Sequence, residues 1–303
     1  MPRWLIWSLV ALLSWGVWAL LSKVVGDSLS AAHSQALSTI GLLPVLLALG
    51  LSKRLSATGN QYRGALYAVV GGALSAAGNV AYYHAMNLGG KAALVVPLTA
   101  LYPLVTVLLA VLLLKESLNS IQGVGVLSSL VAIYLFKVQG KAEFLSAWLA
   151  YALIPIALWG ITGLLQKLAT NDISGELSTL WFLAAFVPVS VVILVQSPLP
   201  DRIGTNTWVL VTALGFFFAL GNFALLAAFA SNGKASVITP LSALYPLVSV
   251  PLAILLLGER IGRRETAGIA LALVAGALLS CERRTEERAA STTPSHLEPR
   301  TEP

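Results

Sequence analysis

Charged residues divide this chain into ten long stretches that contain no Asp, Glu, Lys or Arg. Each stretch is near the length of a membrane-spanning helix, since about 30 Å of hydrocarbon needs roughly 20 mainly apolar residues. Backbone groups in lipid must be satisfied within their own segment, as they are in an α-helix. The pattern therefore predicts an all-α membrane protein with ten transmembrane helices, at residues 4–22, 28–52, 64–90, 92–114, 117–136, 144–166, 177–200, 203–233, 235–258 and 266–281.

Composition agrees with a membrane protein. The 303 residues are 57% hydrophobic and 11% charged, against about 45–50% and about 25% in soluble domains. The net charge of +6 is spread along the chain without a basic block, which favours a membrane surface over nucleic acid. The single cysteine, Cys281, excludes a disulfide framework. Residues 282–303 are rich in Glu, Arg, Ser, Thr and Pro, and we expect a disordered cytoplasmic tail there.

The second half of the chain repeats the first. Residues 90–116 align with 233–259 at an offset of 143, and 18 of these 27 positions are identical, which apolar bias alone does not produce. An offset of 144 aligns the Trp-Gly pair at Trp15 with the pair at Trp159. We therefore predict a first five-helix repeat at residues 1–140 and a second at residues 141–281.

An odd number of helices in each repeat inverts the second copy in the membrane. Inverted repeats form pseudo-symmetric bundles with two similar packings, one open to each side, and are commonly used for alternating access around a midplane site. The repeat thus predicts a transporter. A small excess of Lys and Arg on the N-terminal side, notably Lys53, Arg54 and Arg63, predicts that both termini are cytoplasmic.

These features resemble the EamA type of the drug/metabolite transporter superfamily, which has two tandem five-helix repeats. The resemblance covers residues 4–281 and rests on the two Trp-Gly pairs and on a pattern of Pro, a hydroxyl residue, Leu-Leu-Leu and Glu at residues 97–116 and 240–259. It implies a transporter without an ATPase domain, and the chain has no Gly-x-x-x-x-Gly-Lys-Ser/Thr loop. The family includes exporters of amino acids, other metabolites and toxic compounds, so the resemblance does not specify a substrate.

Two glutamates end the matched segments. Glu116 and Glu259 resemble the Leu-Gly-Glu pattern of the family, although Lys115 replaces the usual Gly in the first half. We expect these carboxylates to anchor the interface or to cap the following helix.

Prolines interrupt two of the predicted helices near mid-membrane. A proline inside a helix donates no hydrogen bond and pushes away the carbonyl four residues earlier, which predicts a free carbonyl at Thr99. The prolines concerned are Pro97, Pro103, Pro240 and Pro246. Freed carbonyls are tolerated beside hydroxyls or a wet cavity, so we predict that substrate contacts Thr99, Tyr102, Ser242 and Tyr245. The alternative is a packing kink whose hydroxyls bond back to their own backbone.

Two pairs of equivalent residues on the first and sixth helices are further candidates for substrate binding. Lys23 and Lys167 lie near the helix ends, and because no carboxylate lies inside any span, they favour an anionic or zwitterionic solute. Snorkelling to lipid headgroups is the alternative. Trp15 and Trp159 lie mid-span, so each indole N–H needs a partner, and they are predicted either to line the substrate cavity or to pack on a glycine.

The third helix carries the remaining candidates. Asn79 and Asn222 are equivalent, and substrate binding or hydrogen bonding between helices would satisfy their amides. Asn79, Tyr82 and Tyr83 share one helix face and are followed by the titratable His84, where the second half has Leu225, Leu226 and Ala227. Because a substrate lacks two-fold symmetry, we expect such differences between the halves to determine selectivity.

Several function classes compete. The leading prediction is a secondary transporter of a small polar metabolite, such as an amino acid or another zwitterion or anion, in a bacterial inner membrane. A non-transporting sensor or scaffold and an exporter of drugs are the alternatives. A membrane enzyme is disfavoured because the spans contain no Ser–His pair, Asp pair or His-Glu-x-x-His helix. We expect no cofactor or metal, and a possible homodimer.

Overall fold

A computed structural model describes residues 1–57, 59–115, 118–136, 146–229, 231, 241–279 and 281, and its described elements are helices apart from one isolated β-bridge between Ala57 and Ile173. The first half consists of α1 (Arg3–Gly26), α2 (Ala31–Ser38) with the 3-10 helix η1 (Thr39–Leu42) and α3 (Leu43–Gly50), α4 (Gln61–Asn87), α5 (Ala92–Thr99) with α6 (Pro103–Leu114), and α7 (Ser120–Phe136). The second half consists of α8 (Ala147–Ala169), α9 (Gly175–Ala184) with α10 (Phe186–Gln196), α11 (Thr205–Phe229), α13 (Pro246–Leu257) and α14 (Arg263–Leu279).

The predicted all-α membrane fold is confirmed. Each of the ten predicted spans contains at least one helix in the described part of the chain. Among the described residues, seven spans are long and apolar enough to cross a membrane. The predicted polar tail at 282–303 lies outside the described residues.

Two spans that we expected to be continuous are broken. The second span changes to a 3-10 helix at Thr39, four residues before Leu43 begins α3, and Pro44 follows at the start of that helix. The seventh span is interrupted at Ala185, between α9 and α10. A proline clashes with the carbonyl four residues earlier, and Pro188 is four residues after Ala184, the last residue of α9.

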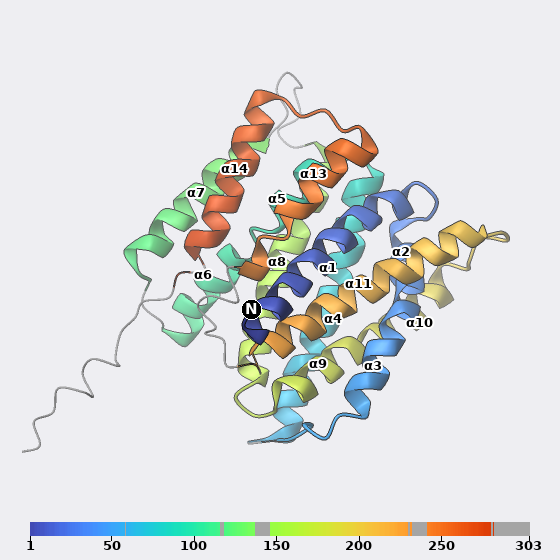
Figure 1. The fold of residues 1–303 in the computed structure, drawn as a ribbon, viewed down its shortest axis with the longest axis vertical. Coiled ribbons are helices and arrows are strands. Elements are labelled where there is room, and N and C mark those ends of the chain that lie inside the picture. Colours follow the sequence, from blue (N-terminus) through green and yellow to red (C-terminus); the bar gives the residue numbers. More distant parts are fainter. Residues whose placement is uncertain are drawn as a thin grey trace, which may run out of the picture.

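The main helix contacts join the two halves. Helix α1 of the first half packs on α11 of the second, and α8 of the second half packs on α4 of the first, while α7 packs on α14 at one side of the bundle (Figure 1). Glycines allow close approach at two equivalent places. A Cβ at Gly215 would overlap the carbonyl oxygen of Ser38, and one at Gly72 would overlap that of Phe182. Small residues at such crossings let backbones approach, which drives helix association in lipid.

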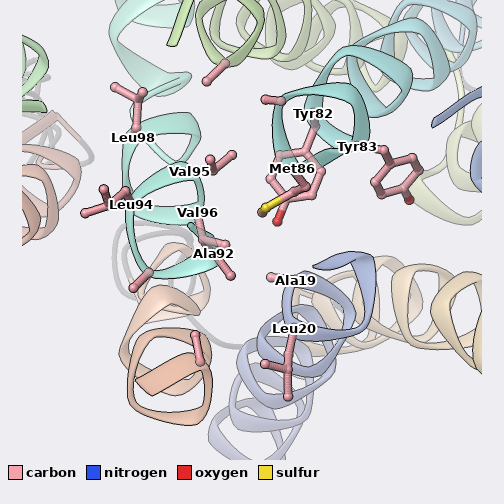
Figure 2. Packing of buried hydrophobic residues seen from close by; sticks show 14 of the residues in the cluster. Ala19, Leu20, Tyr82, Tyr83, Met86, Ala92, Leu94, Val95, Val96 and Leu98 are labelled. Atoms are coloured by element: carbon pink, nitrogen blue, oxygen red, sulfur yellow. The ribbon is translucent and has the colours of Figure 1, made fainter. Parts of the chain in front are cut away.

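The largest buried cluster runs through the bundle and includes residues of α1, α4 and α5. Figure 2 shows Tyr82 and Met86 of α4 on the side that faces α5, with Ala19 of α1 next to them. Tyr82 is 0% exposed and Met86 is 1% exposed. The interior carries the tyrosine hydroxyls of α4 beside the largely apolar α5, and the candidate site lies there.

Candidate functional site

An aromatic cluster joins the two halves in the interior. It consists of Trp18, Tyr82, Tyr83, Trp159 and Phe218. Trp18 is stacked on Tyr82 with ring centroids 5.1 Å apart and an interplanar angle of 16°. Trp159, from the second half, lies 5.6 Å from Tyr82 and 6.0 Å from Trp18, and Phe218 lies 5.5 Å from Trp18. Three predicted site residues, Tyr82, Tyr83 and Trp159, therefore come together.

Hydrogen bonds satisfy the polar atoms of this cluster. The indole Nε1 of Trp18 donates to the Tyr83 hydroxyl at 3.2 Å, and the Ser22 hydroxyl donates to the Tyr82 hydroxyl at 3.3 Å. All four side chains are buried. Because buried polar groups without partners are costly, these bonds fix the orientation of the tyrosine hydroxyls in the apolar interior.

The two Trp-Gly pairs make equivalent contacts. Trp15 packs edge-on against Tyr245 at 6.2 Å, and Trp159 packs edge-on against Tyr102 at 6.3 Å. Each indole also lies against a glycine of a neighbouring helix, Trp15 against Gly221 and Trp159 against Gly78. The Trp159 indole donates a long hydrogen bond, 3.4 Å, to the carbonyl of Ser75. Each tryptophan thus contacts both a glycine and the tyrosine that we predicted as a cavity residue.

The fourth span is broken at mid-membrane as predicted, but the expected free carbonyl at Thr99 is wrong. The backbone N–H of Tyr102 donates to the Thr99 carbonyl at 3.1 Å, because the chain tightens to 3-10 geometry between α5 and α6. The Thr99 hydroxyl bonds back to the Val95 carbonyl at 2.9 Å. Pro97 lies inside α5 and Pro103 begins α6.

The ninth span has the same break. Pro246 begins α13, as Pro103 begins α6, and Tyr245 immediately precedes it. Ser242 and Tyr245 are 3% and 5% exposed, and the Tyr245 hydroxyl interacts with the Thr99 side chain of the other half. Pro240 lies outside the described residues. The breaks of the two halves therefore bring Thr99, Tyr102 and Tyr245 together.

The two predicted lysines have different surroundings. The Lys23 ammonium donates to the Met86 carbonyl at 3.0 Å, at the C-terminal end of α4 where a cation is favoured by the helix dipole. Lys23 lies within α1, which continues to Gly26, past the predicted end at residue 22. Lys167 is exposed in the last turn of α8. The substrate role of both lysines stays a prediction.

The amides and the histidine are also separated. Asn79 is 1% exposed and its Oδ1 has no hydrogen-bond partner. Asn222 donates to the Phe218 carbonyl of its own helix at 2.8 Å. The His84 ring packs edge-on against Tyr151, 4.4 Å away, and Tyr151 is 40% exposed. Asn79 therefore belongs to the interior with Tyr82 and Tyr83, whereas His84 lies toward the outside of the bundle.

Sequence reasoning missed Trp18. Hydropathy does not distinguish a site tryptophan from any other large side chain in an apolar span. The internal repeat did contain a signal for Trp18, because the offset of 144 aligns it with Thr162. The two halves therefore differ at this position, as they do at Tyr82 and Leu225. Trp18 also lies one helical turn after Trp15, which places both on one side of α1.

The two halves also contact each other beyond the C-terminal end of α4, where residues 90–93 lie against residues 259–265. Because α5 begins here, we name this region the α5 end. Glu259 accepts hydrogen bonds from the backbone N–H groups of Ala92 and Ala93 at 2.7 and 2.8 Å. The Lys91 ammonium donates to the Arg260 carbonyl at 2.6 Å and to Glu265 at 3.3 Å. Glu259 thus caps α5 of the other half instead of the following helix, while Glu116 lies outside the described residues.

The opposite end of α4, named the Asp172 end, joins residues 56–63 to 172–174. Arg63 makes a two-pronged ion pair with Asp172, with both N···O distances 2.8 Å. The backbone N–H of Asn60 donates to the same carboxylate at 3.1 Å. The hydrogen bonds from Arg63 lower the pKa of the Asp172 carboxyl below its ordinary value, outweighing the opposite effect of burial.

Comparison with known proteins identifies the family. A model of the EamA-like transporter family matches residues 2–138 and 146–281. An uncharacterised protein of Methanocaldococcus jannaschii is 28% identical over 135 residues, which cover 45% of this chain and 96% of that protein. A crystal structure of a protein without further description shares the fold, with a TM-score of 0.63 and 18% identity over 91% of this chain and 96% of the other. The chain belongs to the EamA-like transporter family, within the drug/metabolite transporter superfamily, and is a multi-pass membrane protein and not an enzyme.

Proposed function

We propose that this protein is a secondary transporter that moves a small polar metabolite by alternating access. The observation that carries the proposal is the aromatic cluster, because it combines hydrogen-bonded tyrosine hydroxyls of one half with Trp159 of the other. A solute bound among these side chains contacts both halves. A change in the relative orientation of the two halves therefore alters which side of the membrane the solute can reach. Sites between inverted repeats work in this way.

Contacts at both ends of α4 support alternating access. The α5 end is held by the bonds of Glu259, and the Asp172 end by the ion pair with Arg63. Both sets join first-half residues to second-half residues. We infer that substrate enters or leaves at one end when the contacts at that end separate while those at the other end hold.

The asymmetry of the cluster favours a polar metabolite over a hydrophobic cation. Tyr82 and Tyr83 have hydroxyls where the second half has Leu225 and Leu226, and Trp18 has an indole N–H where the second half has Thr162, whose hydroxyl donates to the Gly71 carbonyl. Among the described residues, no carboxylate is buried in a span, since the one buried acidic side chain is Asp172 at a helix end. Cations in a membrane interior need such a carboxylate partner.

Counterflow tests the proposal. Purified protein in liposomes preloaded with unlabelled solute is offered the same solute in labelled form, from a panel of amino acids, organic acids and cationic drugs. We expect uptake of a polar metabolite that is lost in a Tyr102→Ala, Tyr245→Ala double variant which still elutes as a single folded species in detergent. Uptake of cationic drugs alone supports the alternative of a drug exporter, and no uptake of any solute supports a sensor or scaffold.

We further propose that both termini face the cytoplasm of a bacterial inner membrane. Cys281, the only cysteine of the sequence, is exposed just after α14 and is a natural reporter. A membrane-impermeant maleimide is expected to label it in inverted vesicles and to leave it unlabelled in intact spheroplasts. The reverse pattern contradicts this orientation. The homodimer stays a prediction, which light scattering of the detergent-solubilised protein tests.

A further inference from the structure

Gln35 of α2 is a buried amide that the protein leaves without partners. Its side chain is 0% exposed, and neither Nε2 nor Oε1 makes a hydrogen bond. The neighbouring hydroxyls do not satisfy it, because Ser38 and Thr39 donate to the backbone carbonyl of Gln35 instead. The hydroxyl of Ser34, which is 1% exposed, has no partner either.

Such a group is costly inside a membrane protein. A primary amide has two donors and two acceptor lone pairs, and its transfer from water without compensating hydrogen bonds is strongly unfavourable. Leu or Met would fill a similar volume without this penalty. An unpaired amide in a helix that otherwise packs well therefore indicates a position where a polar guest supplies the missing bonds.

The position of Gln35 connects it to the aromatic cluster. Helix α2 packs along α4, where Asn87 donates to the Leu29 carbonyl before α2 and the Tyr83 hydroxyl interacts with Ser38 at its end. Gln35 lies between these two contacts. It is three residues before Ser38 and so shares the helix face that meets Tyr83.

A second unpaired amide oxygen lies on α4 itself. Asn79 is 1% exposed with a free Oδ1, and it is one helical turn from Tyr82 and Tyr83. Unpaired amide atoms are thus found on α2, three residues before the Ser38 that contacts Tyr83, and on α4, one turn before Tyr82 and Tyr83. In the second half, Thr179 aligns with Gln35, and Asn222 bonds to its own helix. The feature therefore belongs to the first half, as the tyrosines do.

We propose that Gln35 is a substrate-binding residue and that it selects zwitterionic solutes with a carboxylate and an ammonium group. This inference rests on the proposed transport function. The amide Nε2 of Gln35 donates to the carboxylate, while its Oε1 accepts from the ammonium. Among the described residues the interior presents dipoles and no unpaired charge, which suits a solute whose own two charges cancel.

The test uses the full chain in liposomes and in detergent. The probes are the free amino acids, their methyl esters, which are cations, and their N-acetyl derivatives, which are anions. We expect counterflow of at least one free amino acid, without uptake of its ester or its N-acetyl form. In Gln35→Leu the KM for that amino acid should rise roughly tenfold or more, since hydrogen bonds to charged groups are lost.

A stability readout separates binding from structure. Without solute, Gln35→Leu should melt at a higher temperature than the wild type, because the unpaired amide is gone, while the thermal shift caused by the amino acid should disappear. Gln35→Met provides the same comparison should the branched side chain prevent folding. Thr179→Val, at the equivalent position of the second half, is the matched control and should leave KM within roughly twofold of the wild type, since we place no substrate contact there.

The outcomes distinguish the two proposals. Wild-type transport of zwitterions with an unchanged KM in both Gln35 variants overturns the role of Gln35 and leaves the transport function standing. Equal transport of the esters or the N-acetyl forms overturns the selection for zwitterions. Absence of amino acid transport by a wild type that carries another polar metabolite of the counterflow panel also overturns the selection for zwitterions, whereas absence of transport for the whole panel overturns the proposed function itself.

Discussion

Replacing Glu259 by Gln is expected to loosen the contact between the two halves at the α5 end. The carboxylate accepts one hydrogen bond on each oxygen, from Ala92 at 2.7 Å and from Ala93 at 2.8 Å. A glutamine keeps one acceptor oxygen, loses the negative charge and turns an NH2 group toward the second N–H. The substitution thus removes one bond and weakens the other.

The magnitude follows from these two bonds. A hydrogen bond to a charged group contributes about 1.5–3 kcal/mol and a neutral one about 1 kcal/mol. Because Glu259 is only partly buried, we discount the total loss to about 1–2 kcal/mol, the low end of the range for such bonds. At about 1.4 kcal/mol per factor of ten, the ratio of separated to joined states at the α5 end should rise about 5- to 30-fold.

Distance measurements between spin labels test this change. Labels at Leu88 and Arg263, which are both exposed on the two sides of the contact, are introduced with Cys281→Ser. The wild type should give one short distance, and Glu259→Gln should add a longer one. The matched control is Glu265→Gln, since Glu265 accepts from Lys91 at the longer distance of 3.3 Å and is expected to shift the distribution less.

An equal response of the two variants would refute the special role of the Glu259 cap. An unchanged distribution in Glu259→Gln would refute the inference that these bonds hold the α5 end closed. In either case the capping geometry would be structural, without control over access.

Three further predictions address packing, pH and the site. Gly215→Ala should lower the melting temperature by overpacking against the Ser38 carbonyl, at a cost of about 1–3 kcal/mol, whereas Gly50→Ala, with open space around it, should not. Because the pKa of Asp172 is lowered, its ion pair stabilises the protein above the ordinary aspartate pKa of 3.8, and this stabilisation is lost as pH falls through the lowered value. The difference in melting temperature between the wild type and Asp172→Asn should therefore become smaller on acidification. Trp18→Phe, which removes the indole donor to Tyr83, should raise the KM measured in counterflow several-fold, consistent with the loss of one neutral hydrogen bond.

The spans and the mid-membrane breaks were predictable because lipid imposes simple rules on length, charge and proline. The break before Pro103 follows from the missing backbone N–H of proline, and the internal repeat predicts the same break before Pro246. The same rule applied to Pro44 and Pro188 would have found the breaks near Thr39 and Ala185. We missed them because those spans were assigned from the absence of charge alone.

The faces of the helices were harder to predict. In a soluble protein the apolar side of a helix indicates its buried face. Here lipid and core are both apolar, so hydropathy does not distinguish Trp18 from its neighbours, whereas Gln35 is a polar residue within the second span that we did not single out. The structure places both in the interior, at 4% and 0% exposure. The partner of Glu259 could not be predicted either, since nothing in the local sequence shows that its carboxylate caps a helix of the other half.

The symmetric contacts and the asymmetric cluster have different physical roles. The pairs Trp15 with Tyr245 and Trp159 with Tyr102 repeat the same geometry in both halves, as do the close approaches at Gly72 and Gly215. Equivalent contacts give similar energies to two arrangements of the bundle, which alternating access requires. Among the described residues, Trp18, Tyr82, Tyr83 and the unpaired amides have no equivalents in the second half, and a solute has no two-fold axis. In the proposed mechanism, the repeat therefore supplies the two states, and the departures from it supply the recognition.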